Sequence, residues 1–204
     1  MKWYLTVIFI LTNGLLMSQE LVKEYYSSGQ LKGAGSVING KKEGEWIFYY
    51  PSGKKNTIEN YKEGNLHGQV VYFYPTENIQ GREQWMDGRM QDSAVYFHPN
   101  GKVKSKGLFN QSQYFGQWKY FFENEILERI IHYQNGLPEG VTLIYNENGF
   151  LIQEGNYQKG FEEGEWKFYS DNGELKFYGS YQKGKPIGIW YEIKKGQKKI
   201  YKKY

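Results

Sequence analysis

The polar and apolar positions of this chain repeat with a period of 24 residues. Each period contains two short apolar runs. The first is a continuous run of aromatic and β-branched residues after a glycine, and the second begins with an aliphatic residue and ends near an aromatic one. Short runs of this composition, bounded by Gly, Asn, Asp or Pro, are typical of β-strands, and the bounding residues favour turns. The pattern therefore predicts one two-stranded hairpin and one return turn per period, and it predicts no helix.

Glycine marks the period on two parallel series. A fixed period of this length indicates a repeat architecture, so a residue type that recurs at each step is first of all a packing or turn requirement. The first series gives position zero of each unit, has Asp92 as its one exception and otherwise consists of Gly44, Gly68, Gly116, Gly140, Gly164 and Gly188. The second series lies four residues earlier, has Ser112 as its one exception and otherwise consists of Gly40, Gly64, Gly88, Gly136, Gly160 and Gly184.

Aromatic residues occupy fixed positions within the unit. Positions five and seventeen are aromatic in all six full copies, and position two is Trp in four: Trp46, Trp118, Trp166 and Trp190. Gly107, Gly155 and Gly179 stand two residues before the ring at position seventeen, on the same side of the strand. A missing side chain at these glycines predicts that a neighbouring ring lies across the backbone.

Some copies lack an expected glycine. Asp92 and Ser112 replace the series glycines, and the turn near Glu77 contains none. These departures predict irregular geometry in the middle copies. In the turn that contains Asn124, we expect Asn124 to be the left-handed residue, because Asn tolerates positive φ.

Hairpins joined by short links form an antiparallel meander. The predicted fold class is therefore all-β: a repeat-built antiparallel β-hairpin meander that forms an elongated, single-layer, twisted sheet. At about 4.8 Å per strand, seven two-stranded units give a sheet roughly 70 Å long. The repeat domain is expected to cover residues 19–204 with about seven units of 24 residues.

The segments 40–54 and 160–174 resemble the bacterial variant of the MORN repeat. Their shared pattern is Gly-x-x-x-Gly-x-Trp-x-x-Tyr, followed by a turn with Gly. Six or seven copies fit, over about residues 24–193. The resemblance implies an elongated sheet of hairpins that mediates protein–protein or membrane-proximal contacts. Some related bacterial proteins are catalogued as antitoxin-like, so the resemblance also offers an antitoxin or immunity function.

The first eighteen residues differ from the rest. Lys2 is followed by a mostly apolar run from Trp3 to Met17, then by Ser18 and the polar Gln19. This arrangement predicts a signal peptide over residues 1–18 with cleavage between Ser18 and Gln19. The protein is then exported in a bacterium, as a periplasmic, outer-membrane-associated or secreted protein. The alternative is a retained N-terminal anchor or a buried first strand.

Composition narrows the chemistry. The chain has no cysteine, which excludes disulfides and thiolate metal sites. A chain that begins at Gln19 carries 25 basic and 22 acidic groups, a net charge of +3. Six of these lysines lie in the last eleven residues, so the rest of the chain is slightly acidic and does not fit a nucleic-acid groove. The lysine-rich C-terminus either contacts a membrane or polysaccharide surface or prevents edge-to-edge strand pairing.

The candidate binding surface consists of Trp46, Trp118, Trp166 and Trp190, which either form a stacking platform or are the core of a single-layer sheet. His67, His98 and His132 occupy three different places in the unit, so no metal site is predicted from them. Glu43, Glu139 and Glu163 are interpreted as solvated turn charges rather than a cation-binding row. No catalytic, cofactor-binding or metal-binding residue is assigned.

The repeats account for nearly the whole chain and leave no room for a catalytic domain, so the sequence predicts a protein that is not an enzyme and needs no cofactor. The leading hypothesis is a non-enzymatic protein-binding or scaffold module of the bacterial envelope or secreted space, with a protein partner. The alternatives are an antitoxin or immunity-like protein that masks one partner, and a glycan-binding module that uses exposed aromatic rings.

Overall fold

The computed structural model describes residues 19–204, which form one sheet of 18 strands. The predicted signal peptide, residues 1–18, lies outside the described residues. The strands are β1 (Gln19–Tyr25), β2 (Leu31–Ile38), β3 (Lys41–Tyr49), β4 (Lys55–Lys62), β5 (Asn65–Leu66), β6 (Gly68–Phe73), β7 (Ile79–Met86), β8 (Arg89–Phe97), β9 (Val103–Asn110), β10 (Gln113–Phe121), β11 (Leu127–Gln134), β12 (Leu137–Pro138), β13 (Gly140–Tyr145), β14 (Leu151–Gln158), β15 (Phe161–Tyr169), β16 (Leu175–Gln182), β17 (Lys185–Lys194) and β18 (Gln197–Lys203).

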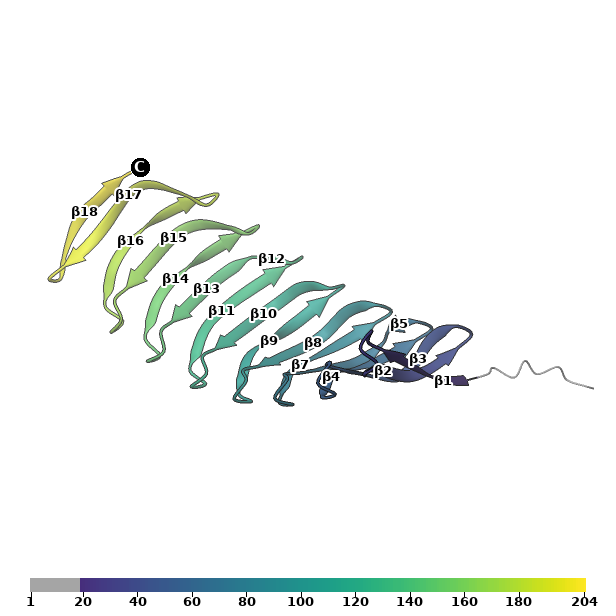
Figure 1. Cartoon of the computed structure of the whole chain (residues 1–204). Helices are drawn as coiled ribbons and strands as arrows, with labels where there is room; N and C mark the ends of the chain where they lie inside the picture. Colours follow the sequence, from purple (N-terminus) through teal and green to yellow (C-terminus); the bar gives the residue numbers. More distant parts are fainter. Residues whose placement is uncertain (1–18) are drawn as a thin grey trace, which may run out of the picture.

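Except for the short strands β5 and β12, every strand pairs antiparallel with its neighbours in chain order, which confirms the predicted hairpin meander. Figure 1 shows the strands side by side along an elongated, twisted single layer. The short strands β5 and β12 each continue into the next strand, so β4 pairs with both β5 and β6, and β11 with both β12 and β13. Among residues 19–204 no helix is long and apolar enough to cross a membrane.

The two glycine series occupy two kinds of left-handed backbone. Glycines of the second series end two-residue return turns, as in Asn39-Gly40, where φ is 51° and 75°. Positive φ at both central residues is the type I′ turn, whose twist matches that of the flanking strands. Glycines of the first series lie at bulges: Gly44 has φ 68°, and β2 pairs Ser36 with Glu43 and Gly35 with Trp46, so two residues of β3 lack partners there.

The copies without a glycine keep the same backbone, so the expectation of irregular geometry there was wrong. Asp92, Ser112 and Glu77 have φ of 70°, 64° and 72°. The strand pairing on both sides of each position fixes the left-handed conformation whichever residue is present.

The prediction that Asn124 is the left-handed residue of its turn was wrong. The left-handed residue is Glu125, with φ 70°. The Asn124 side chain instead holds the turn together: its Oδ1 accepts a hydrogen bond from the backbone N–H of Ile126 at 3.1 Å, and its Nδ2 donates to the carbonyl of Glu147 at 3.0 Å. Asn124 therefore links two successive hairpin turns.

We expect Asp92→Gly to raise the free energy of unfolding by about 1 kcal/mol, because a non-glycine residue at positive φ is strained. The neighbouring Ser93→Gly, in ordinary strand geometry, should lower it by about 0.5–1 kcal/mol. Urea unfolding followed by circular dichroism measures both. Equal losses in the two variants would show that Asp92 carries no strain.

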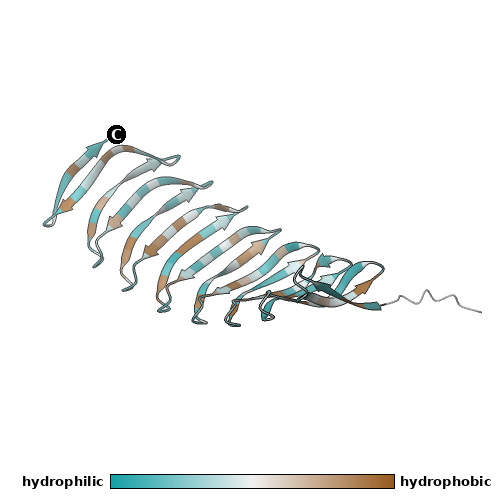
Figure 2. Cartoon of the chain, in the orientation of Figure 1, coloured by the Kyte–Doolittle hydropathy of each residue, from teal (hydrophilic) through white to brown (hydrophobic). Residues whose placement is uncertain are grey.

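The core lies on one side of the sheet, which we call the aromatic face because it carries the four position-two tryptophans. Trp46, Trp118 and Trp166 are each 1% exposed and Trp190 is 7% exposed. Each ring lies over a glycine of the preceding strand, and a Cβ on Gly155 would lie 2.1 Å from Cδ2 of Trp166. This confirms that the strand glycines admit a neighbouring ring. Figure 2 shows hydrophobic segments recurring along successive strands.

In copies without a strand glycine, the sizes of the two facing residues are exchanged. A larger residue at position fifteen faces a small residue at position two of the next unit, as in Glu83 with Ala94. The same exchange relates Ile131 to Thr142, which is 1% exposed. Close-packed interiors tolerate substitutions that conserve total volume. The residues at positions two and fifteen therefore form one packing unit across the two strands.

Candidate binding surfaces

The tryptophans proposed as a binding surface lie in the interior. The indole Nε1 of Trp46 donates to the carbonyl of Ser36 at 2.9 Å, and Trp118 and Trp166 donate in the same way to Leu108 and Asn156. Their burial leaves the rings almost no surface for a ligand. Of the two interpretations of these residues, the burial supports the packing one, and a binding surface has to be sought among other residues.

The repeated glutamates stabilise the return turns. The carboxylates of Glu43, Glu139 and Glu163 each accept a hydrogen bond from a backbone N–H twenty residues later, at 2.8, 2.7 and 2.9 Å. These bonds tie each return turn to the next one. The glutamates therefore have a structural role, and they do not converge on a common point.

The three histidines also have separate structural contacts. His98 Nε2 lies 2.8 Å from the carbonyl of Phe121, His67 lies 3.1 Å from Asp87, and His132 lies 3.2 Å from the carbonyl of Val141. In the part of the chain that the structure describes, no group of three His, Asp or Glu side chains could hold a metal ion.

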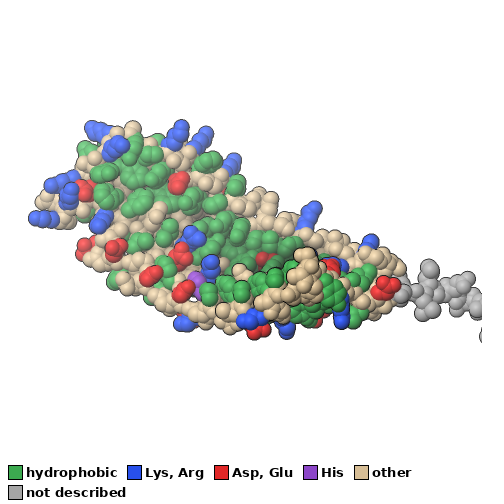
Figure 3. All heavy atoms as spheres, viewed as in Figure 1, with side chains coloured by type: hydrophobic (Ala, Val, Ile, Leu, Met, Phe, Trp, Pro, Cys, Tyr) green, Lys and Arg blue, Asp and Glu red, His purple; other side chains and the backbone are tan. Residues whose placement is uncertain are grey.

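A stripe of half-buried rings runs along the aromatic face beside the tryptophans. Its members are the position-four residues Phe48, Tyr72, Tyr96 and Tyr120. Each is paired with a small residue of the preceding strand: Gly33, Thr57, Gly81 and Ser105. Figure 3 shows hydrophobic side chains gathered along the sheet, with charged side chains towards its margins.

A buried carboxylate lies beside this stripe, in the row of the position-two residues Val70 and Ala94. Glu83 is 7% exposed, and it accepts hydrogen bonds from the hydroxyls of Tyr72 at 2.9 Å and Tyr96 at 2.5 Å and from the indole N–H of Trp85 at 2.9 Å. Burial raises the pKa of both tyrosines well above the ordinary value, and the neighbouring carboxylate raises it further. The tyrosines therefore remain protonated donors.

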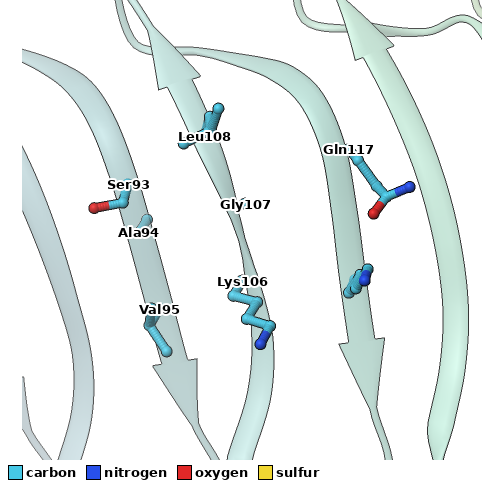
Figure 4. A pocket seen from close by; sticks show the side chains of 8 residues that line it. Ser93, Ala94, Val95, Lys106, Gly107, Leu108 and Gln117 are labelled. Atoms are coloured by element: carbon cyan, nitrogen blue, oxygen red, sulfur yellow. The ribbon is translucent and has the colours of Figure 1, made fainter.

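The side of the sheet away from the tryptophans, which we call the opposite face, has a hollow of about 290 Å³ over β8, β9 and β10. Figure 4 shows side chains that line it, among them Val95, Lys106 and Leu108. Lys106 and Lys119 are directly opposite each other on β9 and β10. Like charges in that arrangement destabilise a sheet. Neither lysine has a carboxylate oxygen within 4.0 Å among residues 19–204.

The equivalent place two repeats later is neutralised. Glu154 and Lys167 occupy the positions of Lys106 and Lys119, and their charged groups are 2.9 Å apart. Hydrogen bonds from Lys167 and from the Tyr169 hydroxyl lower the pKa of Glu154 below its usual value. The fold therefore accommodates an ion pair at this place, and the middle copies have two unpaired cations instead.

Exposed apolar side chains lie next to these lysines. Leu108 is 40% exposed, Phe115, its partner across the strand pair, is 44% exposed, and Val141 on β13 is 55% exposed. His132 of β11 lies between them, in contact with Gln117 of β10 and with the Val141 carbonyl. We call Lys106, Leu108, Phe115, Lys119 and Val141 the opposite-face patch.

Sequence reasoning did not single out Glu83 or the opposite-face patch. The sequence does contain a signal, which appears when the facing positions of successive units are compared. Position fourteen of one unit faces position three of the next, and position fifteen faces position two. At positions fourteen and three, Lys106 and Lys119 are two cations, whereas Glu154 and Lys167 are an anion and a cation. That comparison requires knowing which strands are neighbours.

The profile of the MORN repeat variant matches residues 21–39, 42–63, 93–111, 116–135, 138–159 and 162–183. No curated protein matches the chain. Similar solved structures include the "Crystal Structure of TcdB2-TccC3", with 14% identity over 88% of this chain and 14% of that chain and a TM-score of 0.17. Another is the "Structure of Photorhabdus luminescens Tc holotoxin pore, Mutation TccC3-D651A", with 15% identity over 86% of this chain and 13% of that chain and a TM-score of 0.18. The chain thus spans about one-seventh of those proteins.

Proposed function

Because the chain belongs to the MORN repeat variant family, whose repeats generally mediate binding to proteins or membranes, we propose that it is a non-enzymatic protein-binding module. In this proposal the opposite-face patch is the contact surface, and the partner presents carboxylates beside apolar side chains. Figure 1 shows residues 19–204 as a single layer, and in this proposal a partner contacts one face of it. An extended sheet of this kind is suited to a scaffold role.

The observation that carries the proposal is the pair of lysines at a place where the same fold elsewhere forms an ion pair. Lys106 and Lys119 reduce the stability of the isolated sheet, and an acidic partner would remove that cost. The adjoining Leu108, Phe115 and Val141 supply exposed apolar area of the kind found at protein–protein contacts. Charge and apolar area together favour a protein partner.

We expect Lys106→Glu to separate binding from stability. The new carboxylate pairs with Lys119 as Glu154 pairs with Lys167, so the free energy of unfolding should rise by about 0.5 kcal/mol. Partner recovery from the native host by the tagged full chain, quantified by mass spectrometry, should fall at least about ten-fold, because a like charge now faces the partner.

Lys55→Glu is the matched control, since Lys55 is exposed on β4 outside the opposite-face patch. It should leave recovery of the same partner unchanged. Equal recovery by the Lys106→Glu variant and the unaltered chain would rule out this surface.

We further propose that the protein is exported, with cleavage between Ser18 and Gln19, and that it acts in the periplasm, at the outer membrane or in the secreted space of a bacterium. The order of Lys2, the mostly apolar run from Trp3 to Met17 and then Ser18 supports this. Masking of one specific partner, as by an antitoxin or immunity protein, is the finer alternative within the same binding function. N-terminal sequencing of the protein purified from its host tests the cleavage, and an intact Met1 would exclude it.

A further inference from the structure

The aromatic face has a small pocket, which is separate from the surface proposed above because it opens on the other side of the sheet. The pocket is about 170 Å³ and is lined by Tyr72, Gln80, Gly81, Glu83 and Tyr96. Gly81 is paired with Tyr72 on one side and Tyr96 on the other. The two rings therefore lie on either side of Gly81, and the Tyr96 ring is so close that a Cβ at Gly81 would lie 2.8 Å from Cδ1 of Tyr96. The pocket is smaller than those of drug-sized ligands, which are about 300–1,000 Å³, and suits a single side chain.

Glu83 brings an incompletely used negative charge to this pocket. A carboxylate offers about four acceptor sites, and three donors reach Glu83, from Tyr72, Trp85 and Tyr96. One acceptor site remains. No Lys, Arg or His nitrogen lies within 4.0 Å of Glu83 in the described sheet. Burying a carboxylate without a cation costs free energy, and a ligand cation bound beside it would offset part of that cost.

The same face binds an ammonium group of the chain itself one repeat earlier. Lys42 Nζ lies 4.1 Å from the ring centroid of Trp46 and 4.5 Å from that of Phe48, and it pairs with Glu24 at 3.2 Å. Phe48 occupies the same position in its unit as Tyr72 and Tyr96 do in theirs. The position of Lys42 in its unit is taken by Leu66 and Met90 in the two units that form the pocket. The pocket thus has the rings and the carboxylate but no cation.

We propose that the pocket between Tyr72 and Tyr96 binds an alkylammonium group, presented as a lysine side chain by a partner protein. The rings hold the cation through their negative faces, and Glu83 accepts a hydrogen bond from the ammonium at its remaining site. The source of the lysine rests on the proposed binding function, but the pocket itself can be tested with a small ammonium ion. The opposite-face patch selects acidic groups, so the two faces select opposite charges.

Butylammonium chloride is the probe, titrated into the ¹⁵N-labelled full chain at constant ionic strength. The indole N–H of Trp85 reports on the pocket because it donates to Glu83 at 2.9 Å. We expect a saturable shift of the Trp85 indole signal that is larger than that of the other five tryptophans, and no such shift with n-butanol. Absence of the butylammonium response, or an equal response to n-butanol, overturns the proposal.

Two variants test the residues. Glu83→Gln should weaken butylammonium binding at least about ten-fold, as removal of a charged hydrogen-bond acceptor does, whereas Glu45→Gln, an exposed residue outside the pocket, should have no effect. Gln80 lines the pocket and is exposed, so we expect Gln80→Lys to preserve the fold and to bring an ammonium of the chain to the pocket. That variant should lose the response to butylammonium. If the Gln80→Lys variant still responds to butylammonium as the unaltered chain does, the proposal is wrong. This test holds even if Glu83→Gln fails to fold.

The two proposals fail separately. Lys106→Glu should leave the butylammonium response unchanged, since Lys106 does not line the pocket. Loss of the partner in that variant with an intact butylammonium response would support the opposite-face patch and this pocket as independent sites.

Discussion

Gly155→Ile is expected to lower the free energy of unfolding by about 3 kcal/mol, because the new side chain overpacks the core. A Cβ at Gly155 would lie 2.1 Å from Cδ2 of Trp166, and the Trp166 ring cannot move away because it packs edge-on against Tyr157 and Tyr181 at 5.2 and 5.9 Å between ring centroids. The backbone of Gly155 is ordinary strand, so the loss comes from the ring and owes nothing to φ.

A second substitution should recover part of this loss. Trp166→Thr alone removes a buried ring and should cost about 4 kcal/mol. Together, Gly155→Ile and Trp166→Thr recreate the native pair of Ile131 and Thr142 from the preceding unit. The double variant should therefore be more stable than the sum of the single effects predicts, by at least about 2 kcal/mol.

Urea unfolding of all four chains, followed by circular dichroism, gives this coupling energy. Glu165→Ile is the control for β-branching, because Glu165 is exposed on the adjacent strand, and it should change stability by less than about 0.5 kcal/mol. Strict additivity of Gly155→Ile and Trp166→Thr would show that the two positions are not one packing unit.

Trp118→Ala is expected to cost about 4 kcal/mol and to act locally. Trp118 is the largest member of the core cluster with Ala94 and Phe109, and its ring centroid lies 5.1 Å from that of Phe109 and 4.6 Å from that of Tyr114. Its removal leaves a cavity above Gly107, which has no side chain to fill it.

Hydrogen exchange shows where the loss occurs. Repeat units contact only their neighbours, so protection should fall in β9, β10 and β11 and remain in β15, β16 and β17. Tyr114→Ala, which removes a ring that is 38% exposed, is the control and should cause a clearly smaller loss. An even loss of protection over all strands would mean that the sheet unfolds as one unit and would contradict the local role of Trp118.

The sequence was sufficient for the units and their turns. The aromatic and β-branched runs and the glycine series depend on residues close together in the chain, so both hairpins and bends could be predicted. The glycines beneath the tryptophans were correctly interpreted as space for a ring. The errors came from assuming that a missing glycine changes the backbone. Asp92 and Ser112 adopt positive φ because the flanking strand pairs impose it.

The candidate surfaces could not be found in the same way. The tryptophans were considered for binding because they are large and recur, but their exposure depends on the rings that cover them from neighbouring strands. Lys106 and Glu83 looked like ordinary strand charges. Their significance comes from residues on neighbouring strands: a second lysine for Lys106, and the hydroxyls of two tyrosines for Glu83.

By itself the sequence determined a period, a hairpin in each period and the conformation of the return turns that contain a second-series glycine, because those properties are set by φ preferences and residue pattern within a few residues. Only the tertiary structure decided which side chains are buried, which charges are paired and which face each pocket opens on. The physical reason is the register between strands. The bulge at each first-series position, as at Gly44, shifts the pairing and so decides which residues face one another.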